Sequence, residues 1–392
     1  MADARPKVRT YLDYNATAPA RPEAREAAIS ALAATGNPSS VHAEGRAARR
    51  LVEEARAEVA RLAGVAARCV VFLSGGTEAA DAALNPFFGV GVGAAPLARL
   101  IVGAGEHPCV LFGHRFPPAA VEVAPLRGDG RIDLDWLAAA ADRPERALLA
   151  LQGANNETGV IQPVAEAAAL IHAAGGFVFC DAVQLPGRAD CDIAALGADA
   201  LALSAHKLGG PKGAGALVAA RPDFSLGEPL IRGGGQERGA RAGTENVAAI
   251  AGFGAAARAC LAETGERGRL EALSRQLERA LRAVAPEAHI FGEAAERLPN
   301  TVCFAVPAVE AATLVIALDL AGVAVSSGAA CSSGKVAPSH VLAAMGVEPA
   351  LARGAIRLSL GWASSDEDVD RFAAAFRTAV DRIQAARMTA SA

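Results

Sequence analysis

The sequence predicts an α/β protein with a large domain built on a mainly parallel sheet and a smaller α+β domain. Short and almost continuous apolar runs alternate with loops and segments of helical periodicity as far as residue 218. Strands of this kind are buried on both faces, as in parallel sheets that are covered by helices. The runs that predict a seven-stranded sheet are residues 69–73, 99–102, 120–123, 147–151, 177–180, 200–204 and 214–218.

The segments around the first of these runs predict helices and the breaks between them. We expect an extended segment at residues 11–19 and helices at residues 21–35, 43–63 and 79–84. The first helix ends at the Gly-Asn-Pro-Ser-Ser sequence that begins at Gly36, and Gly64 closes the second, amphipathic helix. The sequence Ser74-Gly-Gly-Thr-Glu78 then joins the first strand to the third helix.

The chain after residue 247 predicts a second, smaller group of elements. We expect helix over residues 247–285 with a break at Gly265 and Gly268, strands at 300–306, 323–325 and 353–360, and helices at 311–322 and 365–386. The last helix begins with Ser-Ser-Asp-Glu, which is an N-terminal capping signature. We therefore expect residues 16–262 to form the large domain, and residues 1–15 and 263–392 to form the small domain.

Composition excludes several classes of protein. Among 392 residues, 52% are hydrophobic and 20% are charged, which is the balance of a folded protein with a large core. A net charge of -4 gives no electrostatic reason to bind nucleic acid or an anionic membrane. No uncharged stretch reaches the ~20 residues that span a bilayer. Seven cysteines without paired spacing predict reduced thiols rather than disulfides or a zinc site, so we expect a cytoplasmic protein without a bound metal.

Lys207 is the first candidate for a catalytic residue. It follows the apolar run 200–204, and open α/β sheets carry their chemistry at the carboxyl ends of their strands. The chain contains only four lysines among its 38 basic residues, so a lysine at a strand end suggests an amine that has to lose its proton, which a guanidinium cannot do. From position alone, a surface lysine beside a turn explains the residue equally well.

Two further strand ends supply complementary groups. The Gly75-Gly76 turn brings backbone N–H groups to the start of a helix, where an anion such as a phosphate is favoured, although many such turns only cap the helix. Asp181 ends the run 177–180, and a carboxylate there needs a cationic partner, either a core arginine or a pyridinium nitrogen. Phosphate, pyridinium and aldehyde are the three groups of pyridoxal 5'-phosphate that a protein can bind. His107 could stack on its ring, or it could simply cap a loop.

On these residues the chain resembles the cysteine desulfurases of the NifS and IscS type, which are fold-type I pyridoxal-phosphate enzymes. The resemblance runs from the Tyr-Leu-Asp-Tyr-Asn-Ala-Thr sequence at residue 11 to the Ile-Arg-Leu-Ser-Leu-Gly sequence at residue 356. The motifs that carry it are Ser74-Gly-Gly-Thr-Glu78, Glu106-His107, Asn155-Asn-Glu-Thr-Gly159, Asp181-Ala-Val-Gln184, Ser204-Ala-His-Lys207 and Ser326-Ser-Gly-Ala-Ala-Cys-Ser-Ser333.

The resemblance implies a role for each candidate residue. Lys207 would bind the coenzyme aldehyde covalently and move the substrate's Cα proton, Asp181 would pair with the pyridine nitrogen, and His107 would stack on the ring as an acid and base. The remaining roles fall to Gly76, Thr77, Ser204 and His206 at the phosphate, Asn156 and Gln184 near the O3' oxygen, and Arg357, Asn15 and Asn156 at the substrate. Thr244, in the glycine-rich segment 233–244, would reach the phosphate of the partner subunit, which implies a homodimer.

Cys331 distinguishes this family from ordinary transaminases. It lies among small residues, and the resemblance implies that its thiolate takes sulfur from L-cysteine, leaving L-alanine and a persulfide for an acceptor such as an iron–sulfur scaffold. The residues alone are equally compatible with a packed small side chain. The alternatives at the level of function are a selenocysteine lyase or small-amino-acid transaminase of the same fold, or a coenzyme-binding scaffold or regulator without turnover. Cys109 is a second thiol near His107; it could be a second sulfur-handling thiol, but we expect it to be a buried spectator.

Overall fold

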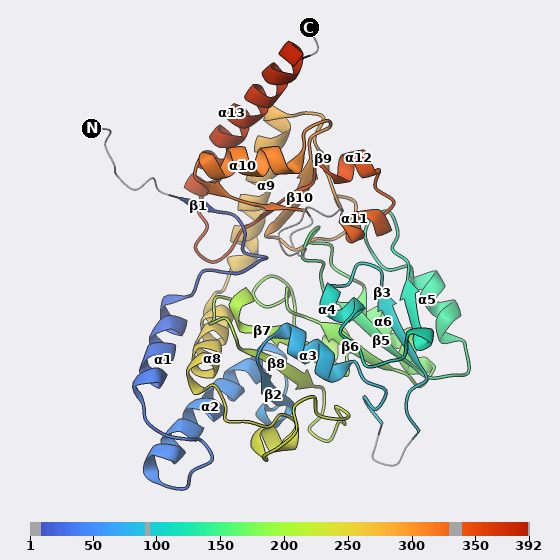
Figure 1. The fold of residues 1–392 in the computed structure, drawn as a ribbon, viewed down its shortest axis with the longest axis vertical. Coiled ribbons are helices and arrows are strands. Elements are labelled where there is room, and N and C mark those ends of the chain that lie inside the picture. The colour runs from blue at the N-terminus through green and yellow to red at the C-terminus, as the bar shows by residue number, and fades with distance from the viewer. Residues whose placement is uncertain (1–8, 91–94, 329–338, 391–392) are drawn as a thin grey trace.

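The computed structural model describes residues 9–90, 95–328 and 339–390, and its largest element is a seven-stranded sheet (Figure 1). The strand order is β2-β8-β7-β6-β5-β3-β4. The strands from β7 to β4 in this order are parallel, whereas β8 is antiparallel to both of its neighbours. The strands are β2 (Val70–Leu73), β3 (Arg99–Gly103), β4 (Val121–Ala124), β5 (Ala147–Gln152), β6 (Phe177–Asp181), β7 (Ala200–Ser204) and β8 (Gly215–Ala219). The mainly parallel sheet predicted from the apolar runs is confirmed.

Successive residues of the central strands enter two different hydrophobic cores. Leu149 and Leu151 of β5 belong to one buried cluster, and Leu148 and Ala150 belong to another. Both faces of the sheet are therefore covered, which explains why these strands are apolar at every position rather than at every second one. The helices that contribute to the first cluster are α1 (Pro22–Ala33), α2 (Ala43–Leu62), α5 (Leu134–Ala141), α6 (Val164–Ala173), α7 (Ile193–Leu196) and α8 (Val247–Ala262). Helices α3 (Gly76–Ala83) and α4 (Pro108–Leu111) contribute to the second.

The helices of this part of the chain pack around the sheet. Helix α8 lies against α1 and α2, and α3 packs on β7 and β8. Helix α3 begins three residues earlier than expected, so its N-terminus lies within the glycine turn itself.

A separate core is formed by residues near the N-terminus and residues 270–380. Its largest sheet has the order β12-β13-β10-β9, and β1 pairs in parallel with β11. The strands are β1 (Thr10–Tyr11), β9 (His289–Ile290), β10 (Thr301–Ala305), β11 (Val323–Ala324), β12 (Ser326–Ser327) and β13 (Ile356–Ser359), and the helices are α9 (Glu266–Val284), α10 (Ala311–Leu320), α11 (His340–Ala344), α12 (Pro349–Ala352) and α13 (Asp366–Ala390). Leu12 packs into this core, which is why we propose that residues 1–15 belong with residues 263–392.

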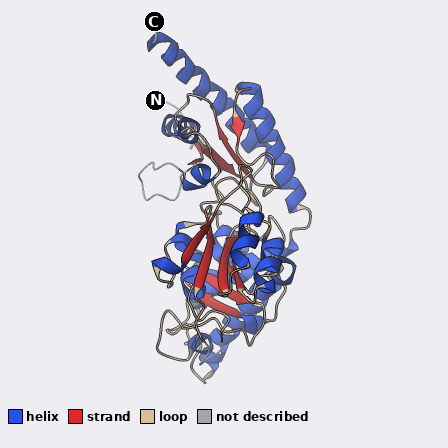
Figure 2. Ribbon diagram, turned by 90° about the vertical axis from the view of Figure 1, so that its right-hand side faces the viewer, coloured by secondary structure: helices blue, strands red, loops and turns tan. Residues whose placement is uncertain are grey.

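Several details differ from the expected elements of this part. The sequence prediction has no counterpart of β9, β12, α11 or α12, and β13 is shorter than the strand expected at residues 353–360. The long helical segment is interrupted at Gly265, whose φ of 85° requires a left-handed backbone, while Gly268 lies inside α9. The last helix, α13, continues four residues further than expected, and Figures 1 and 2 show that its end extends beyond the rest of the molecule. Within the described ranges, no single helix is long and apolar enough to cross a membrane. Helices α8 and α9 have the length and composition of a membrane span only when they are taken together, and they are bent by 81° at the break between them.

Candidate active site

Predicted site residues lie at the carboxyl ends of four strands of the large sheet, and these strands run in the same direction. The parallel pairing of β3, β5, β6 and β7 sets their common direction. Strand β2 shares it, because β2 and β7 are both antiparallel to β8. Asp181 ends β6, Lys207 lies in the turn after β7, His107 follows β3, and Gly76 follows β2. Residues as far apart in the sequence as Gly76 and Lys207, which are 131 positions apart, are thereby brought to the same end of the sheet.

These residues line a single cavity of about 310 Å³. The sequence-predicted residues in its wall are Asn15, Gly76, Thr77, His107, Asn156, Asp181, Gln184, Ser204, His206, Lys207 and Arg357. A drug-sized or coenzyme-sized ligand typically occupies a cavity of this order, lined by apolar surface and a few convergent polar groups. The cavity is therefore the candidate site for both coenzyme and substrate.

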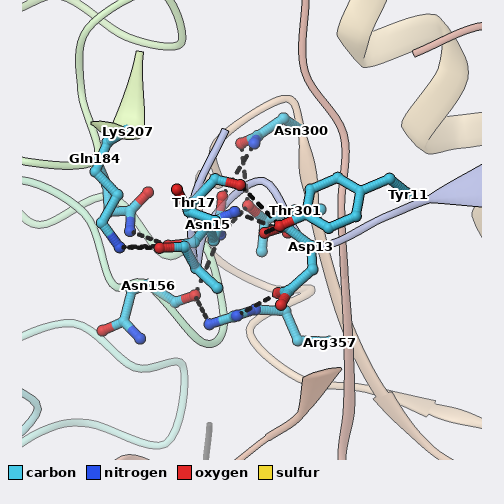
Figure 3. A network of polar contacts seen from close by, with 12 residues as sticks. Tyr11, Asp13, Asn15, Thr17, Asn156, Gln184, Lys207, Asn300, Thr301 and Arg357 are labelled. Atoms are coloured by element: carbon cyan, nitrogen blue, oxygen red, sulfur yellow. Dashed lines mark hydrogen bonds and ion pairs between the residues drawn. The ribbon is translucent and has the colours of Figure 1, made fainter. Parts of the chain in front are cut away.

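The Lys207 amine is held by the N-terminal segment. Its Nζ donates hydrogen bonds to the carbonyl oxygens of Asn15, at 2.6 Å, and Ala16, at 3.1 Å (Figure 3). Gln184 donates from Nε2 to the same Asn15 carbonyl at 3.1 Å, and Arg188 donates to the Gln184 Oε1. These contacts orient the Gln184 amide and keep Lys207 beside the cavity.

Asp181 and His107 form an electrostatically linked pair beside Lys207. Burial raises the pKa of Asp181, while the Val183 N–H, which donates to Oδ1 at 3.0 Å, and the nearby His107 and Lys207 act in the opposite direction. Burial also lowers the pKa of His107, and Asp181 opposes this effect. A cation in the cavity would stabilise the Asp181 carboxylate, which is what a protonated pyridine nitrogen would provide.

The capping geometry of His107 determines where its neutral ring carries a proton. His107 is the N-cap of α4, and its Nδ1 accepts the Cys109 backbone N–H at 3.2 Å. Because Nδ1 accepts this hydrogen bond, the neutral imidazole carries its proton on Nε2. The Cys109 backbone N–H therefore selects the tautomer of the His107 ring, a task that a carboxylate often performs for histidine.

The glycine turn before α3 has the features of an anion cradle. A Cβ added at Gly76 would lie 2.8 Å from Val183 Cγ2, so any larger residue there would require the Val183 side chain to shift. The first-turn N–H groups of an α-helix lack intrahelical partners and favour an anion. Thr77, Ser204 and His206 line both the main cavity and an adjoining hollow. Burial, with Lys207 and Lys212, lowers the pKa of His206 to about 4, so His206 is neutral and can act only as a dipolar partner at neutral pH.

Arg357 on β13 closes the cavity from the second core. Its side chain is 1% exposed, with Nη2 2.7 Å from Asp13 Oδ1 and Nη1 donating to the Asn156 carbonyl at 3.0 Å. Its buried Nε has no hydrogen-bond partner among the described residues. A buried N–H of this kind is costly to leave unpaired, and the carboxylate of an amino acid would satisfy it.

Asn15 links the two cores at this point. Its Nδ2 donates to the Asn156 carbonyl at 3.1 Å and to Thr301 Oγ1 at 2.9 Å (Figure 3). Since Arg357 donates to that same Asn156 carbonyl, Asn15 supports the arginine through a shared acceptor.

One predicted residue, Thr244, does not line this cavity. Thr244 is exposed and lines a neighbouring hollow of about 240 Å³ together with Ser74 and Gly213. Cys331 lies outside the described residues. The chain enters its segment from β12, whose Ser326 pairs with Arg357.

Two polar residues of the cavity wall are not among the site residues that the sequence predicts. Gln152 ends β5 as Asp181 ends β6, and this shared position at the end of an apolar run is the signal that could have identified it. Cys109 also lines the cavity, with Sγ 3.0 Å from His107 Nδ1, so it is not remote from the site. Burial, Asp181 and Glu106 raise the pKa of the Cys109 thiol, which keeps it protonated and a poor nucleophile.

Comparison with known proteins gives one consistent family. The model of the aminotransferase class-V family matches residues 10–372. A cysteine desulfurase of Cereibacter sphaeroides is 43% identical over 384 residues, which are 96% of this chain and 97% of that protein. The cysteine desulfurase IscS of Dictyoglomus turgidum is 38% identical, with coverage of 93% and 92%. A NifS-like protein from Rickettsia africae superposes with a TM-score of 0.85 at 33% identity, covering 95% of this chain and 99% of that structure.

Proposed function

Because this chain belongs to the aminotransferase class-V family and is a pyridoxal-phosphate-dependent cysteine desulfurase, we propose that its 310 Å³ cavity holds both the coenzyme and L-cysteine. The observation that supports this most is the convergence of Lys207, Asp181 and the Gly76 turn, which match the aldehyde, the pyridine nitrogen and the phosphate. When bound, the coenzyme supplies an aldehyde for the substrate amine and a protonated ring that accepts electrons from the Cα–H bond.

The residues of the large sheet position the coenzyme and move protons. With the coenzyme bound, the Asp181 carboxylate would favour a protonated ring nitrogen, and His107, with its proton on Nε2, would lie beside the ring. The Gly76 and Thr77 N–H groups, with Ser204 and His206, take the phosphate. Lys207 would hold the coenzyme through its aldehyde in the resting enzyme, and its Nζ would act as the base for the substrate's Cα proton.

Arg357 binds the substrate carboxylate, with Asn15 and Asn156 behind it. A guanidinium suits this task because it stays charged and presents several N–H groups in one plane. Asp13 holds Nη2 in place, and the Nε, which has no partner in the described part of the chain, is the group that an incoming carboxylate would satisfy.

Sulfur transfer requires Cys331. Its thiolate attacks the substrate sulfur, an S–S bond forms as the substrate C–S bond breaks, and the bonding electron pair stays with the substrate carbon, which is then protonated to give L-alanine. The sulfur remains on Cys331 as a persulfide for an acceptor protein. An iron–sulfur scaffold as acceptor, and a location in the cytoplasm, are predictions from the sequence.

Turnover with free cysteine tests this function directly. We expect the purified protein with pyridoxal phosphate and a thiol reductant to release alanine and sulfide in equal amounts. Alanine produced only with a keto-acid acceptor, without sulfide, would instead identify a transaminase. Higher activity towards selenocysteine, together with cysteine turnover close to background, would identify a selenocysteine lyase.

We also propose that the active unit is a homodimer in which Thr244 completes the partner's phosphate site. Within one chain Thr244 is exposed and outside the main cavity, as a residue that serves a second copy must be. Thr244→Ala and Lys207→Ala subunits should each have low activity alone. Mixed dimers of the two should regain activity, because one of their sites combines an intact Lys207 with the partner's intact Thr244. Verified mixed dimers with no more activity than the parents would contradict shared sites.

A further inference from the structure

We propose that Glu78 and Arg241 form a charge-balanced pair that holds the phosphate turn in shape without repelling the phosphate. The proposal rests on the function above, since it assigns the phosphate to the Gly76 turn. It adds two residues to that site, a carboxylate that positions the turn and an arginine that neutralises this carboxylate.

Glu78 stabilises the turn through a hydrogen bond to its backbone. Its Oε2 accepts the Ser74 backbone N–H at 2.7 Å, and so bridges the first turn of α3 to the residue that precedes the two glycines. The Glu78 side chain is 9% exposed, and Glu78 lines the same hollow as Thr77, Ser204 and His206. Any anion held by that turn therefore has the Glu78 carboxylate as a close neighbour.

A carboxylate at this position has opposing effects. It is favoured at a helix N-terminus in a protein without a ligand, because it interacts with the unpaired N–H groups. A phosphate at the same N-terminus carries the same sign of charge, and two anions in a partly buried site repel each other strongly. An unpaired Glu78 would therefore stabilise the turn and weaken phosphate binding.

Arg241 provides the compensating charge. Its Nε donates to Glu78 Oε1 at 3.1 Å, on the oxygen that Ser74 does not use. Burial raises the pKa of Glu78, but the hydrogen bonds from Ser74 and Arg241 outweigh burial and lower it overall, so Glu78 is ionised and paired. The pair as a whole is neutral beside the phosphate.

The segment that carries Arg241 is itself anchored by a buried ion pair. Glu237 accepts both ends of the Arg56 guanidinium at 2.6 and 2.7 Å, and also the Phe72 N–H of edge strand β2 at 2.9 Å. Glu237 and Arg238 have φ values of 47° and 57°, a left-handed backbone that these residue types rarely adopt. Because several contacts hold this strained conformation, the position of the segment is fixed. Arg241 lies three residues after Arg238, so its position is fixed with the segment.

Coenzyme titrations of the dimeric apoprotein test the pair, with pyridoxal 5'-phosphate and pyridoxal as matched ligands that differ only in the phosphate. Arg241→Gln leaves the Glu78 carboxylate unbalanced, so Kd for the phosphate form should rise about ten-fold. Kd for pyridoxal should change less than about two-fold. Glu78→Gln/Arg241→Gln removes both charges and keeps an acceptor for Ser74, so it should return the phosphate-form Kd to within about three-fold of the wild-type value.

Two further variants keep the result interpretable. Arg241→Lys preserves the charge and should bind the phosphate form nearly as well as the wild type. Arg275→Gln changes the net charge equally but breaks only an exposed pair with Glu271 on α9, and should leave both affinities unchanged. Circular dichroism of every variant checks that the apoprotein is folded.

Equal weakening of both ligands by Arg241→Gln, or a double variant as weak as Arg241→Gln alone, would overturn the charge-balance proposal and show that Arg241 is only structural. In that case the wild type would still prefer the phosphate form. If the wild type instead binds pyridoxal as tightly as pyridoxal 5'-phosphate, the Gly76 turn is not a phosphate site. The proposed phosphate site and the charge-balance proposal would then both be wrong.

Discussion

Lys207→Ala should lower desulfurase turnover by about 10³-fold or more, because the substitution removes both the covalent anchor of the coenzyme and the base that moves the Cα proton. The variant should still fold and take up coenzyme through the Asp181 and Gly76 contacts, but borohydride should no longer fix the coenzyme to the chain. The two measurements are sulfide release from cysteine and the mass of the borohydride-treated peptide.

Lys212→Ala is the matched control for this prediction. Lys212 lies five residues further along the chain and is exposed, whereas Lys207 lines the cavity. The Lys212→Ala protein should keep the borohydride-fixed coenzyme on the peptide that contains Lys207. Coenzyme found on Lys212 in the wild-type protein would show that the wrong lysine has been assigned.

Cys331→Ser should separate sulfur transfer from proton transfer. Sulfide and alanine release should fall by about 10³-fold or more, because a hydroxyl is a far weaker nucleophile towards sulfur and cannot hold a persulfide. Lys207 and Asp181 act on the Cα–H bond and are intact, so exchange of the cysteine Cα proton with deuterated water should continue. Nuclear magnetic resonance of recovered cysteine measures this exchange.

Cys109→Ser provides the comparison among thiols. The Cys109 thiol lines the cavity, but its raised pKa leaves little thiolate at neutral pH, so sulfide release should persist when it is replaced. Radiolabelled sulfur from cysteine should appear on the peptide that contains Cys331 and disappear on addition of thiol. Label on the Cys109 peptide, or full turnover by Cys331→Ser, would contradict the role given to Cys331.

The sequence by itself determined most of the central sheet and the residue types of the site. The strands were recognisable because a strand covered on both faces must be apolar at every position, and this leaves a local pattern in the chain. The site residues were recognisable because Asp181 and Lys207 are polar groups placed at or just after the ends of such runs, where burial without a function is costly. Resemblance to the cysteine desulfurases then supplied their roles.

Only the tertiary structure decided which distant segments meet. Strand β1 pairs with β11 through Thr10 and Val323. The chain that follows β1 places Asn15 against Lys207 and against the Asn156 carbonyl that Arg357 also uses. The link between Glu78 and Arg241 likewise joins residues 163 positions apart. Hydrophobic periodicity reports how each segment is buried but not against which partner. Contacts of this kind depend on the packing of the whole chain, and no local pattern in the sequence encodes them.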